Sequence, residues 1–157
     1  MAHLCSEEGK PVMYQVGHHA LAASNQPIFG ILTQPIPHDW RSDIELGSSS
    51  FIETSHVDYL QAAGARVIPV DYRMDIVSLE KLLGQLNGFY IPGDTKLSFE
   101  DPDFTNTVNT VMKWAGDHND AKEQNMHFPV VGVSYGYMSM IQSQVMNESF
   151  YETLRDD

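Results

Sequence analysis

Residues 132–136 read Gly-Val-Ser-Tyr-Gly, which is the G-x-S-x-G spacing of a nucleophile elbow. In an elbow, a reactive side chain stands on a tight turn between a strand and a helix, and small neighbours allow the turn to close. An apolar run precedes Ser134 and a helical pattern follows it, as this geometry requires. We therefore predict an elbow with Ser134 in the nucleophile position, flanked by Gly132 and Gly136. A purely structural Gly-Ser turn is the alternative.

A serine nucleophile also requires a base that takes its proton and a group that orients the base. In α/β-hydrolases both follow the elbow in the chain, whereas residues 135–157 contain no histidine. His127 stands at the start of the strand that leads to the elbow, so that strand carries it away from Ser134. His56 lies on the apolar face of a predicted helix, where a packed histidine is expected rather than a base. A serine esterase of the α/β-hydrolase type is therefore the weakest hypothesis.

Short apolar runs alternate with helical patterns four times from residue 27 onward. Ser50 and Glu53 have the spacing of a capping box, so the first helix is expected to begin at Ser50. Val67 and Ile68 are expected to form the core of the second strand. The patterns predict strands at 28–32, 66–70, 87–91 and 129–133, and helices at 50–63, 76–83, 101–115 and 135–146. Short connections between them predict an α/β fold: a doubly wound, flavodoxin-like, mostly parallel sheet with helices on both faces.

The predicted α/β domain occupies residues 27–150 of the 157-residue chain, a length that suits one domain. Residues 1–26 show no period and are expected to form an extended or disordered arm, and residues 151–157 an acidic tail. The adjacent His18 and His19 lack further ligands and are expected to be solvated. The single cysteine, Cys5, excludes an intramolecular disulfide and a Cys-rich zinc site. The sequence indicates no metal site and no cofactor.

The charge balance restricts the partners of the chain. Nine basic residues against 21 acidic ones give a formal net charge of −12. This charge repels phosphate backbones and anionic headgroups, so nucleic-acid binding and docking on membrane surfaces are not expected. The apolar stretches are too short for a membrane span, and no secretory signature is seen in residues 1–26. The sequence therefore leaves the compartment unknown.

Four segments in colinear order resemble one known family. They are residues 27–35, 51–70, 87–93 and 128–137, and the resemblance covers about residues 27–142. The family is that of the γ-glutamyl hydrolases, in the class I glutamine amidotransferase-like superfamily and peptidase family C26. It is typically secreted, lysosomal or vacuolar. The resemblance implies the α/β fold predicted above, with a sheet that is incomplete at its carboxyl-terminal end, because the catalytic histidine and its acidic partner lie in the family's carboxyl-terminal half.

The departures from the family concern its chemistry. Ser134 stands where the family has its cysteine nucleophile, and a serine hydroxyl does not inherit the acidity of a thiol. Asp94 stands where the second glycine of a Pro-Gly-Gly turn helps to stabilise the oxyanion, and its carboxylate opposes that charge. The backbone N–H of Tyr135 occupies the position of the other oxyanion donor.

The resemblance thus implies a γ-glutamyl hydrolase-like chain that is catalytically degenerate, is inactive alone, and acts as a binding or structural subunit. The alternative is an active γ-glutamyl (folylpolyglutamate) hydrolase completed by residues or a chain not present here. Because exposed sheet edges and apolar faces favour association, we expect self-association or another protein chain as partner. The resemblance leaves a γ-glutamyl ligand open.

Overall fold

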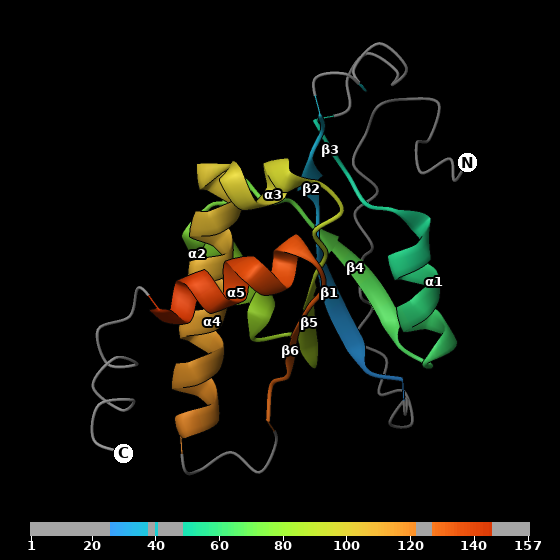
Figure 1. Ribbon diagram of the computed structural model, residues 1–157. Helices are drawn as coiled ribbons and strands as arrows, with labels where there is room; N and C mark the ends of the chain where they lie inside the picture. The colour runs from blue at the N-terminus through green and yellow to red at the C-terminus, as the bar shows by residue number, and fades with distance from the viewer. Residues whose placement is uncertain (1–25, 38–39, 41–48, 122–126, 146–157) are drawn as a thin grey trace, which may run out of the picture.

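A four-stranded parallel sheet lies at the centre of the computed structural model, which describes residues 26–37, 40, 49–121 and 127–145 (Figure 1). Its strands are β1 (Ile28–Leu32), β4 (Arg66–Val70), β5 (Gly88–Ile91) and β6 (Val130–Gly132), in the order β4-β1-β5-β6. Every neighbouring pair is parallel. The predicted doubly wound α/β fold is confirmed.

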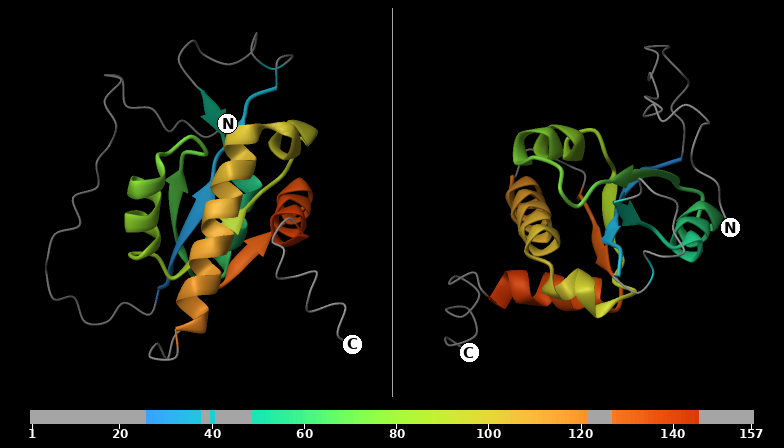
Figure 2. Two further views of the ribbon diagram at one scale, coloured as in Figure 1. Left: turned by 90° about the vertical axis from the view of Figure 1, so that its left-hand side faces the viewer. Right: turned by 90° about the horizontal axis from the view of Figure 1, so that it is seen from above.

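Helices cover both faces of this sheet, as predicted (Figure 2). One face carries α1 (Thr54–Ala62), and the opposite face carries α2 (Ile76–Leu83) and α4 (Pro102–Asp120). A short helix, α3 (Lys96–Glu100), and the last helix, α5 (Tyr135–Val145), contact each other, and α5 also packs against α4 and β6. Within the described residues, no helix is long and apolar enough to cross a membrane.

The larger core lies between the sheet and the pair α2 and α4. Asp101 begins α4 because its carboxylate accepts the backbone N–H groups of Asp103 and Phe104, at 2.9 and 3.1 Å. The inward side chains of both helices recur at a spacing of three or four residues, so they share one face. Those that are at most 1% exposed are Leu79, Leu83, Phe104, Val108 and Val111.

The smaller core lies under α1. Ile31 of β1, Tyr90 of β5 and Leu60 of α1 form it, and all three are at most 6% exposed. His56 precedes Leu60 by four residues, which places both side chains on the same face of the helix. The first turn of α1 therefore directs a polar ring toward the sheet.

The start of α1 corrects a prediction. Ser50 and Phe51 form β3 (Ser50–Phe51), which pairs antiparallel with β2 (Gln34–Pro35), and the helix begins only at Thr54. The Phe51 ring also packs on Trp40, with ring centroids 5.2 Å apart. Glu53 is the N-cap without a side-chain cap hydrogen bond, so the capping-box prediction is wrong. Strand pairing and aromatic packing outweighed the local helix signal.

Three further details differ from the sequence expectation. Helix α4 extends to Asp120, beyond the predicted end at residue 115. In β4 the fully buried residue is Val70, while Val67 and Ile68 are only partly buried. Helix α3 follows the third strand and was not predicted, because its five residues are too few for a helical period. The expected arm except for its last residue, Gln26, the His18–His19 pair and the acidic tail lie outside the described residues.

The order of the strands creates a topological switch point between β1 and β5. The chain passes from β1 to β4 on one side and returns to β5 on the other side of β1. In open α/β sheets, ligands bind at such a switch point, beyond the carboxyl ends of the two strands. Gln34 follows β1 and Asp94 follows β5, so two polar residues lie at this point.

Candidate functional site at the switch point of the sheet

Ser134 occupies a strained turn between β6 and α5. Its φ is 54°, in the left-handed region that non-glycine residues rarely adopt, and its side chain is exposed. The flanking glycines are crowded by backbone: a Cβ on Gly132 would lie 2.9 Å from Tyr137 Cα, and one on Gly136 would lie 2.1 Å from the Ile91 carbonyl oxygen. The geometry holds the hydroxyl of Ser134 at the carboxyl end of the sheet.

The two backbone donors expected at the oxyanion positions are both engaged within the chain. The N–H of Asp94 donates to the side-chain oxygen of Gln34 at 2.8 Å. The N–H of Tyr135 donates to the carbonyl oxygen of Gly93 at 3.2 Å. An oxyanion bound at Ser134 would have to break these hydrogen bonds before either donor could stabilise it.

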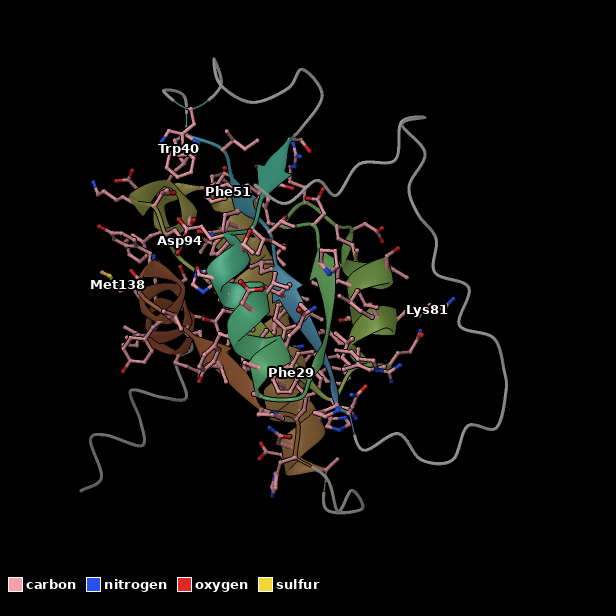
Figure 3. The ribbon with its side chains drawn as sticks, turned by 90° about the vertical axis from the view of Figure 1, so that its right-hand side faces the viewer. Phe29, Trp40, Phe51, Lys81, Asp94 and Met138 are labelled. Atoms are coloured by element: carbon pink, nitrogen blue, oxygen red, sulfur yellow. The ribbon has the colours of Figure 1, made fainter. Side chains whose placement is uncertain are left out.

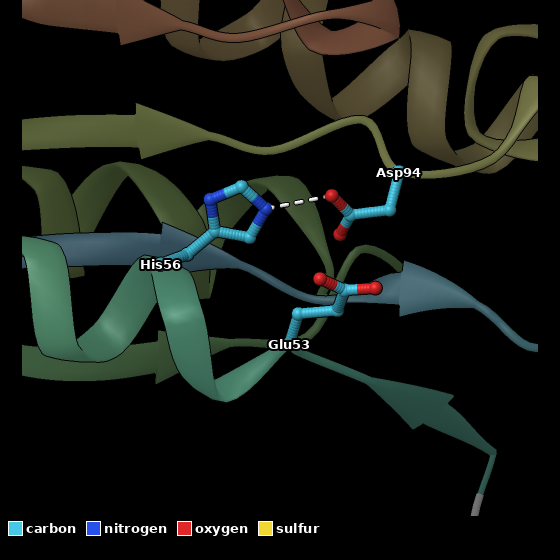
Figure 4. Close-up of side chains that lie close together, drawn as sticks. All are labelled: Glu53, His56 and Asp94. Atoms are coloured by element: carbon cyan, nitrogen blue, oxygen red, sulfur yellow. Dashed lines mark hydrogen bonds and ion pairs between the residues drawn. The ribbon is translucent and has the colours of Figure 1, made fainter.

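The Asp94 carboxylate is held between two partners. One oxygen accepts a hydrogen bond from His56 Nε2 at 2.7 Å (Figure 4), and the other accepts the side-chain amide of Gln34. The side chains of His56 and Asp94 are only 12% and 16% exposed. The carboxylate that was expected to oppose an oxyanion therefore belongs to a histidine–aspartate pair beside the elbow.

His56 has partners for both ring nitrogens. Its Nδ1 lies 2.9 Å from the hydroxyl of Tyr90, and its Nε2 is bound to Asp94. The sequence predicted a packed histidine at this position, and the ring does pack near Tyr90, with centroids 5.4 Å apart. Since a base must offer an unprotonated, unpartnered nitrogen, this arrangement leaves His56 no nitrogen for Ser134.

Gln34 ties the site to the rest of the fold. It is fully buried, and its oxygen accepts the Asp94 N–H and, at 2.9 Å, the hydroxyl of the equally buried Ser98 in α3. A buried amide whose oxygen and nitrogen both have partners fixes its neighbours firmly. Helix α3, absent from the sequence prediction, supplies one of these partners.

Glu53 completes the polar cluster from the start of α1. One of its oxygens lies within 4.8 Å of a ring nitrogen of His56 and of a carboxylate oxygen of Asp94, which are in turn within that distance of each other. Figure 3 looks onto the α1 face of the sheet, with Asp94 near one end of α1 and Phe29 near the other. Glu53 itself is exposed and accepts a long hydrogen bond of 3.3 Å from Ser55.

The other two described histidines lie away from the elbow. His127 is exposed and precedes β6, whose opposite end carries Ser134. His118, in the last turn of α4, stacks on Trp114 with ring centroids 4.7 Å apart. The expectation that the strand separates His127 from Ser134 agrees with these positions.

Comparison with known proteins finds relatives of this sequence. No family model matches the chain. It is 32% identical over 127 residues to γ-glutamyl hydrolase B of Dictyostelium discoideum, covering 81% of this chain and 34% of that protein. It is 34% identical to γ-glutamyl hydrolase 1 of Arabidopsis thaliana, covering 76% of this chain and 33% of that protein. The chain is a γ-glutamyl hydrolase-like protein. A mouse γ-glutamyl hydrolase is 28% identical over 73% of this chain and 33% of its own length.

This γ-glutamyl hydrolase-like chain spans about a third of the length of the curated relatives it matches. Within this matched third, the identities support the family resemblance drawn from the sequence. The activity, substrates and partners of the whole relatives come to this chain only as proposals.

Four residues of the site escaped the sequence reasoning on the γ-glutamyl hydrolase-like chain. Gln34, Glu53 and Tyr90 were not predicted as site residues, and His56 was expected only to be packed. A usable signal existed for Gln34, because a polar residue directly after a buried strand lies at the carboxyl edge of the sheet. Tyr90 had no such signal, since it sits inside an apolar strand.

The pKa of the Tyr90 phenol is raised above its ordinary value of 10.0, chiefly by burial and further by the negative charge of Asp94. A raised folded-state pKa stabilises the protein fully below the unfolded pKa, and this contribution is lost as the pH rises through the folded pKa. We therefore expect the free energy of unfolding to fall more steeply above about pH 10 in the wild type than in Tyr90→Phe.

Urea unfolding between about pH 9 and 12, with absorbance at 295 nm to follow phenolate formation, measures this difference. Tyr137→Phe is the matched control because Tyr137 is 55% exposed. It should keep the wild-type profile. Parallel pH profiles for the wild type and Tyr90→Phe would contradict the shift.

Proposed function

We propose that this chain is a catalytically degenerate γ-glutamyl hydrolase-like subunit that binds a partner rather than hydrolysing γ-glutamyl bonds. The proposal is carried by the state of the oxyanion positions: the N–H groups of Asp94 and Tyr135 are already donated to Gln34 and Gly93. Loss of a single oxyanion donor costs an acyl-transfer enzyme about 10²–10³-fold in kcat. With both donors engaged, a tetrahedral intermediate at Ser134 lacks its main stabilisation.

Proton transfer from Ser134 lacks a free base, just as the oxyanion lacks free donors. A serine hydroxyl is a weak nucleophile unless an adjacent base accepts its proton. Among the described histidines, His56 lies nearest to the turn of residues 92–94 after β5, here called the Asp94 turn. Yet both of its ring nitrogens are bound, to Tyr90 and to Asp94. The Asp94 carboxylate also adds negative charge where an oxyanion would form.

The partner half of the proposal rests on the β6 side of the molecule. β6 is an edge strand of the sheet, and α5 lies beside it. Large apolar side chains of β6, the elbow and α5 are between 38% and 55% exposed: Val131, Val133, Tyr137, Met138 and Ile141. An edge strand beside exposed apolar side chains is suited to pairing with another chain or a second copy.

An active enzyme is the second candidate. It is favoured by Ser134, whose hydroxyl is exposed on a strained turn at the carboxyl end of β6. Another chain, or residues beyond those present here, would then have to bring a base to this hydroxyl. The substrate class would be γ-glutamyl peptides, as the names of the relatives indicate.

Release of glutamate from a γ-glutamyl peptide separates the two candidates. We expect no release above buffer from the wild-type chain, and the same result for Ser134→Ala and Ser134→Cys, because a better nucleophile leaves both oxyanion donors engaged. Binding of the γ-glutamyl peptide without turnover would agree with a binding role. Wild-type turnover that Ser134→Ala abolishes, alone or with a co-purifying chain, would establish the active enzyme instead.

Sedimentation velocity tests the expected partner. The chain should self-associate or co-sediment with another polypeptide, and Met138→Asp on the exposed face of α5 should weaken the association. A well-folded wild-type chain that sediments as a monomer at all concentrations and with no bound polypeptide would contradict the proposed subunit role.

A further inference from the structure

The cluster of Glu53, His56 and Asp94 unites the donor atoms of a metal site. The three side chains come from the start of α1, its first turn and the turn after β5, and one donor atom of each lies within 4.8 Å of the others (Figure 4). Two atoms bound to the same tetrahedral zinc ion are about 3.3 Å apart, from metal–ligand distances near 2.0–2.2 Å. His56 Nε2 and Asp94 Oδ1, at 2.7 Å, need to open only slightly.

The third donor, the carboxylate of Glu53, must move closer to the other two to bind the same ion. Glu53 is exposed, and among the described residues its carboxylate accepts a single side-chain hydrogen bond, that of 3.3 Å from Ser55. We expect a change of side-chain rotamer at Glu53 to bring its carboxylate onto the other two donors. The site is thus partly formed by two fixed ligands and completed by one mobile ligand.

The two fixed ligands already have the outer partners of a metal site. Ligating histidines almost always bond their second nitrogen to another group, which fixes the tautomer and the ring orientation. Here Tyr90 takes that place, 2.9 Å from His56 Nδ1. Without a metal, Nε2 carries the proton that it donates to Asp94. With a metal bound, the neutral ring would instead hold its proton on Nδ1, donate it to the Tyr90 oxygen and present Nε2 as the ligand. Gln34 holds the second oxygen of Asp94 and leaves the first directed at His56.

The charge of the cluster favours a divalent cation. Two carboxylates meet one imidazole, and their hydrogen-bond partners among the described residues, apart from His56, are the neutral side chains of Gln34 and Ser55. The imidazole nitrogen selects a transition metal over Mg²⁺ and Ca²⁺, which prefer oxygen. Three nitrogen and oxygen ligands with an open fourth position are typical of zinc sites that also bind water.

We propose that Glu53, His56 and Asp94 bind a divalent transition-metal ion, with Zn²⁺ the best fit, at the switch point of the sheet. Tyr90 and Gln34 act as positioning residues for His56 and Asp94. This proposal is independent of the proposed degenerate function. It adds a ligand site that the sequence did not predict.

Zinc titration of the full chain by calorimetry tests the site. We expect His56→Gln and Glu53→Gln each to lower the affinity for Zn²⁺ by at least tenfold, and Tyr90→Phe to lower it by about 10- to 100-fold. His127→Gln is the matched control, since His127 is exposed and distant from the cluster, and its affinity should equal that of the wild type. Mg²⁺ should bind more weakly than Zn²⁺ to every variant.

Two further measurements test by independent signals whether the metal binds at these residues. Co²⁺ in place of Zn²⁺ should give a visible d–d spectrum in the wild type that His56→Gln changes. Zn²⁺ should raise the melting temperature of the wild type by more than that of Glu53→Gln at the same concentration, and the exposed Glu53 side chain can be replaced without disturbing the fold. Equal affinity and stoichiometry for Zn²⁺ in the wild type, His56→Gln and Glu53→Gln would overturn the proposal.

Discussion

Replacing Gly136 by alanine is expected to destabilise the protein by about 3 kcal/mol, the upper end of the cost of overpacking. The added Cβ would lie 2.1 Å from the carbonyl oxygen of Ile91 and 2.7 Å from that of Pro92. Both obstacles are backbone atoms of the segment that carries Asp94, so neither can turn aside as a flexible side chain could. The elbow and the Asp94 turn would have to separate.

Gly116→Ala is the matched control. Among the described residues, and apart from the neighbouring residues and the backbone of its own helix, nothing lies within 4 Å of a Cβ placed on Gly116, an exposed position within α4. Alanine there should stabilise the protein by roughly 0.5–1 kcal/mol, because glycine is the weaker helix former. Urea denaturation measures both variants. A Gly136→Ala variant as stable as the wild type would mean that the elbow does not pack against the Asp94 turn as described.

Replacing Gln34 by alanine is the second change with a large expected effect, also about 3 kcal/mol. It removes the partners of three groups: the N–H of Asp94, one oxygen of its carboxylate, and the hydroxyl of Ser98. A buried polar group left without a partner costs about 1–3 kcal/mol. Ser98 is fully buried, whereas water can reach the Asp94 side chain, so the larger share of the cost falls on Ser98 and the backbone N–H.

Urea denaturation also measures the stability of Gln34→Ala. Gln61→Ala is the matched control, because Gln61 is exposed on α1. Its stability should stay within roughly 0.5 kcal/mol of the wild type. If Gln34→Ala were no less stable than Gln61→Ala, the network that joins β2, α3 and the Asp94 turn would have no energetic role, and the fixed position of Asp94 would need another explanation.

Much of the fold was accessible from the sequence because its signals are local. The bounds predicted for β1 and α2 agree with the structure, since a short apolar run and a helical period each depend only on neighbouring residues. The start of α1 was predicted wrongly at Ser50, because β3 pairs with Gln34 and Pro35, which are distant in the chain. No local pattern predicts that pairing.

The site divides in the same way. Ser134 and its flanking glycines could be selected from five consecutive residues, and Asp94 from a resemblance at one turn. The partners of Asp94 could not, because His56 and Gln34 stand 38 and 60 residues away and meet it only where three segments converge. Sequence reasoning therefore expected a carboxylate opposed to an oxyanion, and missed the histidine and amide that hold it.

The amino-acid order alone determined that this chain forms alternating strands and helices, places a serine on a tight turn, and resembles γ-glutamyl hydrolases. The strands, the helices and the turn depend on residues near one another in the chain, and the resemblance depends on the order of residues within four short segments. Only the tertiary structure decided that the oxyanion donors are engaged, that His56 pairs with Asp94 and Tyr90, and that Glu53 joins them. Hydrogen bonds between distant segments depend on distance and direction in space, and these exist only once the sheet has brought the ends of β1 and β5 together.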